Sequence, residues 1–260
     1  MSRRTHCSTR STRDAARWKR SIKRCRRTSR ISRARVRFEA KVRDMELKLY
    51  SRYRNSAGQR VRTALNIKGG AYEYIPVSLD GGTPDDYVRD INPQALIPSL
   101  VIDGEIVTQS TALVEFIEET FDGPSLLPDD PIARARSRAF GQVIACEMHP
   151  VIGPKLQRHM ASVYNIDEAG RKAWYKHWLA EGFATLEALL RRREKPTAFC
   201  YDEKPTIGDL YLVPQIYNAV RAGLNMSDYP LVCELDERCR ALPEFDKAMP
   251  QNQPDYTGEI

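Results

Sequence analysis

The sequence predicts an α/β domain with a mixed four-stranded sheet, then an all-α domain, behind a basic N-terminal segment. Three observations lead to this fold class. Short apolar strands alternate with helical stretches between Met45 and Thr120, strand signals disappear beyond Pro131, and the balance of charge reverses near Met45. We therefore expect three parts, namely residues 1–44, an α/β domain over 45–124 and a helical domain over 131–260.

The first part is strongly basic. Residues 1–44 contain 17 Lys and Arg against 3 Asp and Glu, whereas the whole chain carries a net charge of only +7, so the rest is acidic. Because the segment has few large apolar side chains to offset its ordering entropy, we expect disorder. It could be a nucleic-acid-binding arm, an Arg-rich transit peptide, or a translated region upstream of a start at Met45. We favour the third, since strand-like Glu46–Tyr50 follows Met45 without a linker, and we do not expect nucleic acid as a partner.

The composition argues against a membrane protein and against a metal site. No run approaches the roughly 18 apolar residues that a membrane-spanning helix needs. Six cysteines occur with no CxxC pair and no other metal-ligand spacing, so we expect structural thiols and no bound metal. A cytoplasmic location fits this cysteine usage best.

The α/β domain opens with a βαβ pattern. A short apolar strand at Leu47–Tyr50 precedes a helical stretch at Arg60–Ile67, and the Gly69-Gly70 pair ends that helix before a second strand at Tyr72–Val77. After a loop and a short helical segment, the strands Ile97–Ile102 and Glu105–Thr108 flank Asp103-Gly104, a dipeptide typical of tight hairpin turns. The helix Ser110–Thr120 then completes the domain.

The helical domain shows one clear capping signal. Thr206 and Asp209 have the spacing of a capping box at a helix start. Trp174, Trp178 and Phe183 recur at helical spacing, and we expect them in the core and not around a substrate.

Local motifs resemble one family closely. Asn55-Ser56-Ala57 followed by Arg60-Val61-Arg62-Thr63-Ala64-Leu65 is similar to the zeta-class glutathione transferase signature, in which Ser-Ser-Cys precedes x-x-Arg-Val-Arg-Ile-Ala-Leu. Further similarity lies in Asn92-Pro93, Ile97-Pro98-Ser99, Gln109-Ser110, the stretch Asp209–Gln215, and Gln253-Pro254-Asp255. The chain thus resembles maleylacetoacetate and maleylpyruvate isomerases from Met45 to about Tyr256. Ala57 and Asn55 depart from the signature by replacing its cysteine and its first serine.

The resemblance implies a thioredoxin-like domain joined to a helical domain, the glutathione transferase fold. It also implies glutathione as the cofactor, a homodimer, and the cis-trans isomerisation of a small dicarboxylate in aromatic-compound catabolism. Two alternatives from the same fold stay open: a general glutathione transferase that conjugates or dehalogenates electrophiles, and a noncatalytic glutathione-binding protein, which Ala57 and Asn55 make credible.

Two groups of residues carry the expected chemistry. Ser56 and Asn55 lie where a helix begins, so a hydroxyl or amide donor and the helix dipole could favour the glutathione thiolate, although either residue could simply cap the helix. By resemblance, Arg54 beside this loop and Arg221 in the helical domain bind the substrate carboxylates, since a guanidinium can bind a carboxylate in a bidentate manner. A solvated surface arginine is the alternative for Arg221.

The remaining candidates would bind glutathione. Gln109 and Ser110 open a helix, and a helix N-terminus suits the γ-glutamyl carboxylate. The resemblance implies a cis peptide at Ile97-Pro98, with the Ile97 backbone facing the cysteinyl group, and a role for His149 in contacting glutathione. Plain capping is the alternative for Ser110, and simple packing is the alternative for His149.

Overall fold

A mixed four-stranded sheet forms the N-terminal half of the structure. The computed structural model describes residues 45–79 and 82–258, so the expectation of disorder over residues 1–44 lies outside it. The strands are β1 (Leu47–Ser51), β2 (Glu73–Pro76), β3 (Ser99–Ile102) and β4 (Glu105–Thr108). Their order is β2-β1-β3-β4, with β1 parallel to β2 and antiparallel to β3, and with β4 antiparallel to β3. This is the thioredoxin-like arrangement that the sequence predicts.

The turn chemistry accounts for the register of the hairpin. Asp103 and Gly104 both have positive φ, 50° and 90°, as a tight two-residue hairpin turn requires. Ile102 therefore pairs with Glu105 and Ser99 with Thr108. The strand expected from Ile97 begins only at Ser99, because Pro98 has no N–H to donate to a strand ladder.

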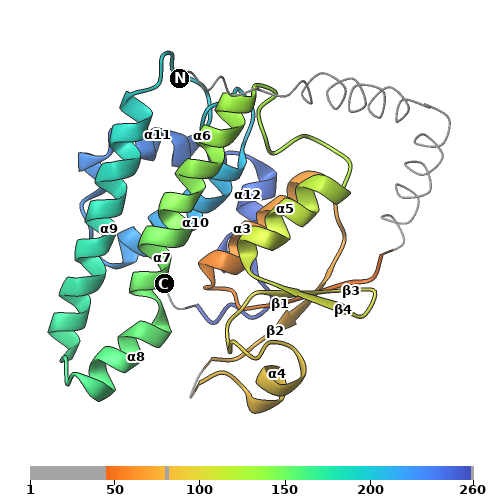
Figure 1. The fold of residues 1–260 in the computed structure, drawn as a ribbon, viewed down its shortest axis with the longest axis vertical. Helices are drawn as coiled ribbons and strands as arrows, with labels where there is room; N and C mark the ends of the chain where they lie inside the picture. Colours follow the sequence, from red (N-terminus) through yellow and green to blue (C-terminus); the bar gives the residue numbers. More distant parts are fainter. Residues whose placement is uncertain (1–44, 80–81, 259–260) are drawn as a thin grey trace, which may run out of the picture. The chain divides into compact units, whose positions relative to one another are not determined.

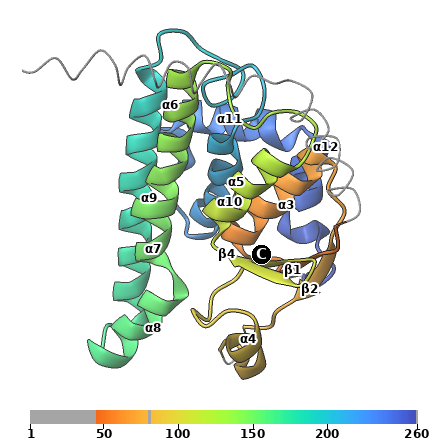
Figure 2. The same cartoon turned by 45° about the vertical axis from the view of Figure 1, so that its right-hand side comes forward.

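Helices cover both faces of the sheet. Helices α3 (Ser56–Lys68) and α5 (Ser110–Thr120) lie on one face, and the short α4 (Asp85–Asp90) lies on the other, as Figures 1 and 2 show. Helix α3 begins four residues earlier than expected because the Asn55 side chain caps it by accepting from the Gly58 N–H. It ends as predicted, with Gly69 in the left-handed conformation.

The second half of the structure is all-helical, as predicted. It contains α6 (Pro131–Gln142), α7 (His149–Ile152), α8 (Pro154–Val163), α9 (Glu168–Arg191), α10 (Ile207–Arg221), α11 (Pro230–Arg240) and α12 (Pro243–Ala248), with a π-helical turn at Val143–Met148 and 3-10 turns at Met226–Asp228 and Pro250–Asn252. The predicted capping box is present at the start of α10, where the Asp209 carboxylate accepts from the Thr206 N–H at 2.7 Å.

The two halves pack together as one compact unit over Met45–Ile260. Helices α10 and α12 contact α3. Arg62 of α3 is fully buried and donates to the carbonyls of Arg52, Tyr53 and Ala248. Near the C-terminus, Asp255 accepts from the Tyr53 N–H and the Tyr74 hydroxyl. These contacts fix the loop between β1 and α3 from two sides. The proposed boundary between residues 124 and 131 stays a prediction.

Three aromatic residues of α9 pack among the helices. Phe183 is fully buried, Trp178 packs against the core, and Trp174 donates its indole N–H to the Val151 carbonyl at 2.7 Å. None of the three lines the cavity described below. Among the described helices, none is both long and apolar enough to cross a membrane, and the described residues contain no His, Cys, Asp and Glu cluster suited to a metal ion.

Candidate active site

A cavity of about 720 Å³ lies where the two halves meet. Its walls come from the β1–α3 loop, the loop before β3, the start of α5, and helices α7 to α10. No Asp or Glu occurs among the described residues of the wall. Six cationic residues do, namely Arg52, Arg54, Arg60, Lys155, Arg158 and Arg221. Since residues 45–260 are acidic in total, this concentration of positive charge marks an anion-binding site.

Asn55 and Ser56 have different roles in the loop. The Asn55 amide oxygen accepts from the Gly58 N–H and so caps α3, while its role toward a thiol stays a prediction. The Ser56 hydroxyl oxygen accepts from the Asn218 side-chain amide at 2.8 Å. Because that bond occupies a lone pair, the hydroxyl proton is available to donate to an anion in the cavity.

Gly58 permits this close arrangement. A Cβ atom at position 58 would lie 2.1 Å from the Ser51 hydroxyl and 2.8 Å from the Asn55 amide oxygen. A side chain there would therefore displace the cap of α3. The first turn of this helix, which carries the positive end of the helix dipole, consequently stays at the cavity wall.

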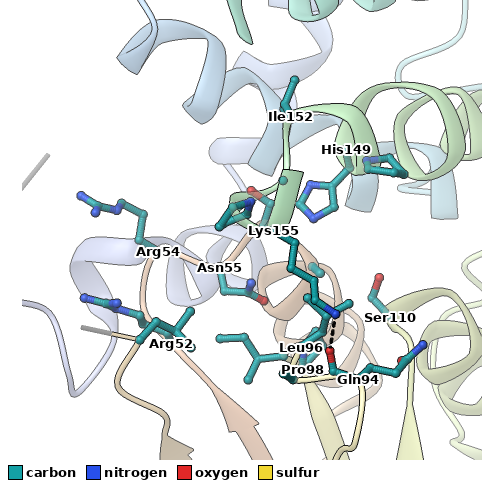
Figure 3. A pocket seen from close by; sticks show the side chains of 18 of the residues that line it. Arg52, Arg54, Asn55, Gln94, Leu96, Pro98, Ser110, His149, Ile152 and Lys155 are labelled. Atoms are coloured by element: carbon teal, nitrogen blue, oxygen red, sulfur yellow. Dashed lines mark hydrogen bonds between the residues drawn. The ribbon is translucent and has the colours of Figure 1, made fainter. Parts of the chain in front are cut away.

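Two arginines from different halves of the structure influence Tyr175 through their charge. Arg54 and Arg221 both line the cavity, and the positive charges of both oppose the rise in the Tyr175 pKa that burial causes. Arg221 is exposed, with its guanidinium 6.0 Å from the centre of the Tyr217 ring. In Figure 3, Arg52 and Arg54 extend from the loop on one side of the cavity, and Ser110 lies on the other side.

The loop before β3 forms another wall. The Ile97-Pro98 peptide is cis, as predicted, and both residues line the cavity. The Leu96 carbonyl accepts from the Asn92 side-chain amide at 2.7 Å and from the Tyr87 hydroxyl at 2.8 Å, which holds the loop in place.

Gln109 and Ser110 join β4 to α5. Gln109 has a φ of 72°, an uncommon conformation for a residue with a side chain, and its amide donates to the Gln94 side chain at 2.8 Å. Ser110 is the first residue of α5, and its hydroxyl oxygen accepts from Arg60 Nη1 at 3.2 Å. The helix therefore begins at the cavity wall, as the sequence predicts.

His149 reaches the cavity from the helical half. It directly follows the π-helical turn Val143–Met148, and Figure 3 shows its ring directed toward the loop that carries Asn55. Burial, together with the positive charge of Arg60, lowers the His149 pKa to about 3. His149 is therefore neutral at physiological pH, and its Nδ1 has no hydrogen-bond partner among the described residues.

Sequence reasoning missed several residues of the wall. Asn218 lies three positions before Arg221 on α10, and Lys155 and Arg158 have the same spacing on α8. That spacing places each pair on one helical face, a signal that the sequence contains. Lys155 donates to the Gln94 carbonyl at 2.9 Å, which connects α8 to the α/β half (Figure 3).

Comparisons with known proteins agree with this geometry. Residues 49–125 match the model of the glutathione S-transferase N-terminal domain family. The chain is 40% identical to maleylacetoacetate isomerase of Rhizobium meliloti over 210 residues, which cover 79% of this chain and 96% of that protein. It is 36% identical to maleylpyruvate isomerase of a Ralstonia species over 213 residues, which cover 80% of this chain and 99% of that protein.

Solved structures give the same result. A maleylacetoacetate isomerase structure from Methylobacterium extorquens AM1, with bound malonate and GSH, matches with a TM-score of 0.78 and 34% identity over 81% of this chain and 100% of that chain. The chain therefore belongs to the zeta class of the glutathione transferase family, together with the maleylacetoacetate and maleylpyruvate isomerases.

Proposed function

We propose that this protein catalyses the glutathione-dependent cis-trans isomerisation of maleylacetoacetate or maleylpyruvate. The observation that carries the proposal is the cavity wall, with its six cations and no carboxylate among the described residues. The substrate has two carboxylates and glutathione adds more negative charge, so both ligands need a cationic site. A general transferase acting on neutral electrophiles needs cations for glutathione but none for its second substrate.

The residues present fit glutathione. The N-terminus of α5, with Ser110 and Gln109, suits the γ-glutamyl carboxylate, because a helix N-terminus attracts anions. The Ile97 backbone faces the place we assign to the cysteinyl group, and His149, neutral and with an unpartnered Nδ1, provides a hydrogen-bonding group on the opposite wall. These four residues form the proposed cofactor site.

Bound glutathione supplies a thiolate, which adds to the cis double bond and leaves after rotation about the resulting single bond. Ser56 donates its proton toward the sulfur and so favours the ionised form. Asn218 fixes the direction of that hydroxyl, and the dipole of α3 acts in the same sense. Asn55 contributes by capping α3 and holding this geometry, and not through its amide oxygen.

Arg54 and Arg221 bind the substrate carboxylates from the two halves of the structure. Arg54 lies on the α/β side of the cavity and Arg221 on the helical side, so they can hold the two ends of the diacid while its central bond rotates. Their charge also stabilises the negative charge that develops on the substrate after addition. The His149 ring is neutral at pH 7 because its pKa is lowered to about 3, so it does not act as a cationic acid in the reaction.

We also propose a cytoplasmic homodimer. Ile106 on β4 and Ile132 on α6 are large apolar side chains exposed on the two halves, which suits a partner that packs its sheet domain against the helices of this one. The four cysteines in the described part of the chain are unpaired thiols, as in a reducing compartment.

Assay of the purified chain on both diacids, with and without glutathione, tests the activity. We expect turnover that depends completely on glutathione and returns it unchanged. The proposal would be contradicted if neither diacid were isomerised while glutathione conjugates of neutral electrophiles accumulated.

A further inference from the structure

Arg60 differs from every other cation around the cavity. It lies in the second turn of α3, is only 2% exposed, and still lines the cavity. Its Nη1 donates to the Ser110 hydroxyl at 3.2 Å, and its guanidinium lies 4.4 Å from the centre of the Tyr211 ring. Its Nε and Nη2 have no hydrogen-bond partner among the described residues. The guanidinium is thus buried and held, but incompletely bonded.

Arg62, two positions later, shows what a structural buried arginine looks like in the same helix. Its guanidinium donates to three backbone carbonyls and to the Ser51 hydroxyl, so its hydrogen-bonding capacity is used. Arg60 has no carboxylate partner in the described part of the chain, and burial lowers its pKa only to about 10, so it remains charged at neutral pH. A buried charge without a counterion is costly, and proteins retain such groups where a ligand completes them.

An anion that pairs with Arg60 would lie beside Ser110 at the cavity wall. Arg60 and the positive end of the α5 dipole both converge on Ser110, and no acid lies among the described residues of the wall there. Since the Ser110 oxygen already accepts from Arg60, its proton has to be donated elsewhere, and the cavity is the side that Ser110 faces. An anionic oxygen is the acceptor that such an arrangement suits.

We infer that Arg60 is a positioning residue for glutathione, which orients the Ser110 hydroxyl and supplies buried positive charge behind it for the α-carboxylate of the γ-glutamyl group. This inference rests on the proposed assignment of Ser110 to glutathione. Tyr211 assists by holding the guanidinium against its ring, so that Arg60 cannot turn away from Ser110. Arg60 does not itself contact the reacting thiol.

Calorimetric binding of two ligands to the full chain tests the inference. The first ligand is glutathione, and the second is γ-aminobutyryl-cysteinylglycine, which lacks only the α-carboxylate. Arg60→Met should weaken glutathione binding by about tenfold to a hundredfold, as expected for one hydrogen bond to a charged group, and leave the affinity for the second ligand unchanged. Arg60→Lys, which keeps the charge, should retain most of the preference for glutathione.

A double-mutant cycle locates the effect. If Arg60 acts through Ser110, then Arg60→Met adds little to the loss that Ser110→Ala causes alone. Arg138→Met is the matched control, because Arg138 is paired with Glu115 away from the cavity and its replacement should change neither affinity. Melting curves verify that each variant is folded.

The possible results separate the inference from its basis. Equal losses of affinity for both ligands in Arg60→Met and Arg60→Lys, or additive losses with Ser110→Ala, would overturn the role of Arg60. If Ser110→Ala keeps the full preference for glutathione, the assignment of Ser110 fails first and the inference fails with it.

Discussion

Ser56→Ala removes the hydroxyl that we place beside the glutathione thiol. Ser56 lines the cavity and its oxygen accepts from Asn218 at 2.8 Å, so its proton remains available to an anion in the cavity. Asn218→Ala makes the milder change, since it keeps the hydroxyl and removes only the bond that fixes its direction. The two variants together measure how much of the thiol ionisation the protein provides.

The size of the effect follows from the ionisation of the thiol. A free thiol with a pKa of about 8.5 is about 3% ionised at pH 7. A hydrogen bond to the charged form, worth about 2 kcal/mol, lowers that pKa to about 7, so that about half of the bound thiol is ionised. Ser56→Ala should then reduce turnover at pH 7 by about 15-fold. Asn218→Ala, at about 1 kcal/mol, should reduce it about threefold.

The sign of the pH dependence distinguishes this role from a general loss of structure. The pKa of the bound thiol rises in both variants, so the defect is largest at low pH and disappears well above pH 8.5 or so. Turnover against pH and ultraviolet titration of the bound thiolate measure it. Thr185→Ala is a suitable control, because Thr185 is exposed on α9 and bonds only to the Glu181 carbonyl of its own helix. An unchanged thiol pKa in Ser56→Ala would refute the reasoning and move the role to backbone donors.

Three further predictions concern other parts of the structure. Arg221→Ala should lower catalytic efficiency on the diacid by about 30- to 150-fold, leave glutathione affinity unchanged and be only partly rescued in Arg221→Lys; equal losses on a neutral electrophile would contradict the carboxylate assignment. Burial raises the Asp236 pKa to about 6, above its value in the unfolded chain, so the folded state binds more protons. The free energy of unfolding should therefore fall by on the order of 2 kcal/mol as the pH rises from about 4 to 6. Asp236→Asn should flatten that slope in denaturant titrations at several pH values, and a slope unchanged from wild type would exclude Asp236 as its source. Sedimentation should give a dimer at micromolar concentration, and a monomer there would refute the proposed assembly.

Local sequence signals were sufficient for most of the fold. The hairpin at Asp103-Gly104, the end of α3 at Gly69 and the start of α5 at Ser110 were all predicted at the residue where they occur. Each depends on the backbone conformation or the capping side chain of one or two residues, and these can be recognised from the local sequence. The apolar pattern alone places the start of α3 too late, at Arg60, because the cap at Asn55 precedes the first apolar residue of that pattern.

The site could be predicted only in part. Ser56, His149 and Arg221 were identified by resemblance, and the structure brings all three to one cavity. The spacing of Asn218 and Arg221 places both on one face of α10, but the contact of Asn218 with Ser56 and the place of Tyr175 beside the cavity come from the packing of the two halves, which spacing along the chain does not encode. The same limit applies to burial, since Arg60 and Arg62 look equivalent in the sequence but have different partners in the structure.

The hydrogen bond between Asn218 and Ser56 joins residues 162 positions apart. During synthesis, the sheet and α3 leave the ribosome long before α10 does, so a nascent chain has the Ser56 hydroxyl without the amide that aims it. On our assignment, a thiol held by such an unfinished chain stays mostly protonated. Full activation of the thiol, on this assignment, is therefore completed only when α10 packs against α3.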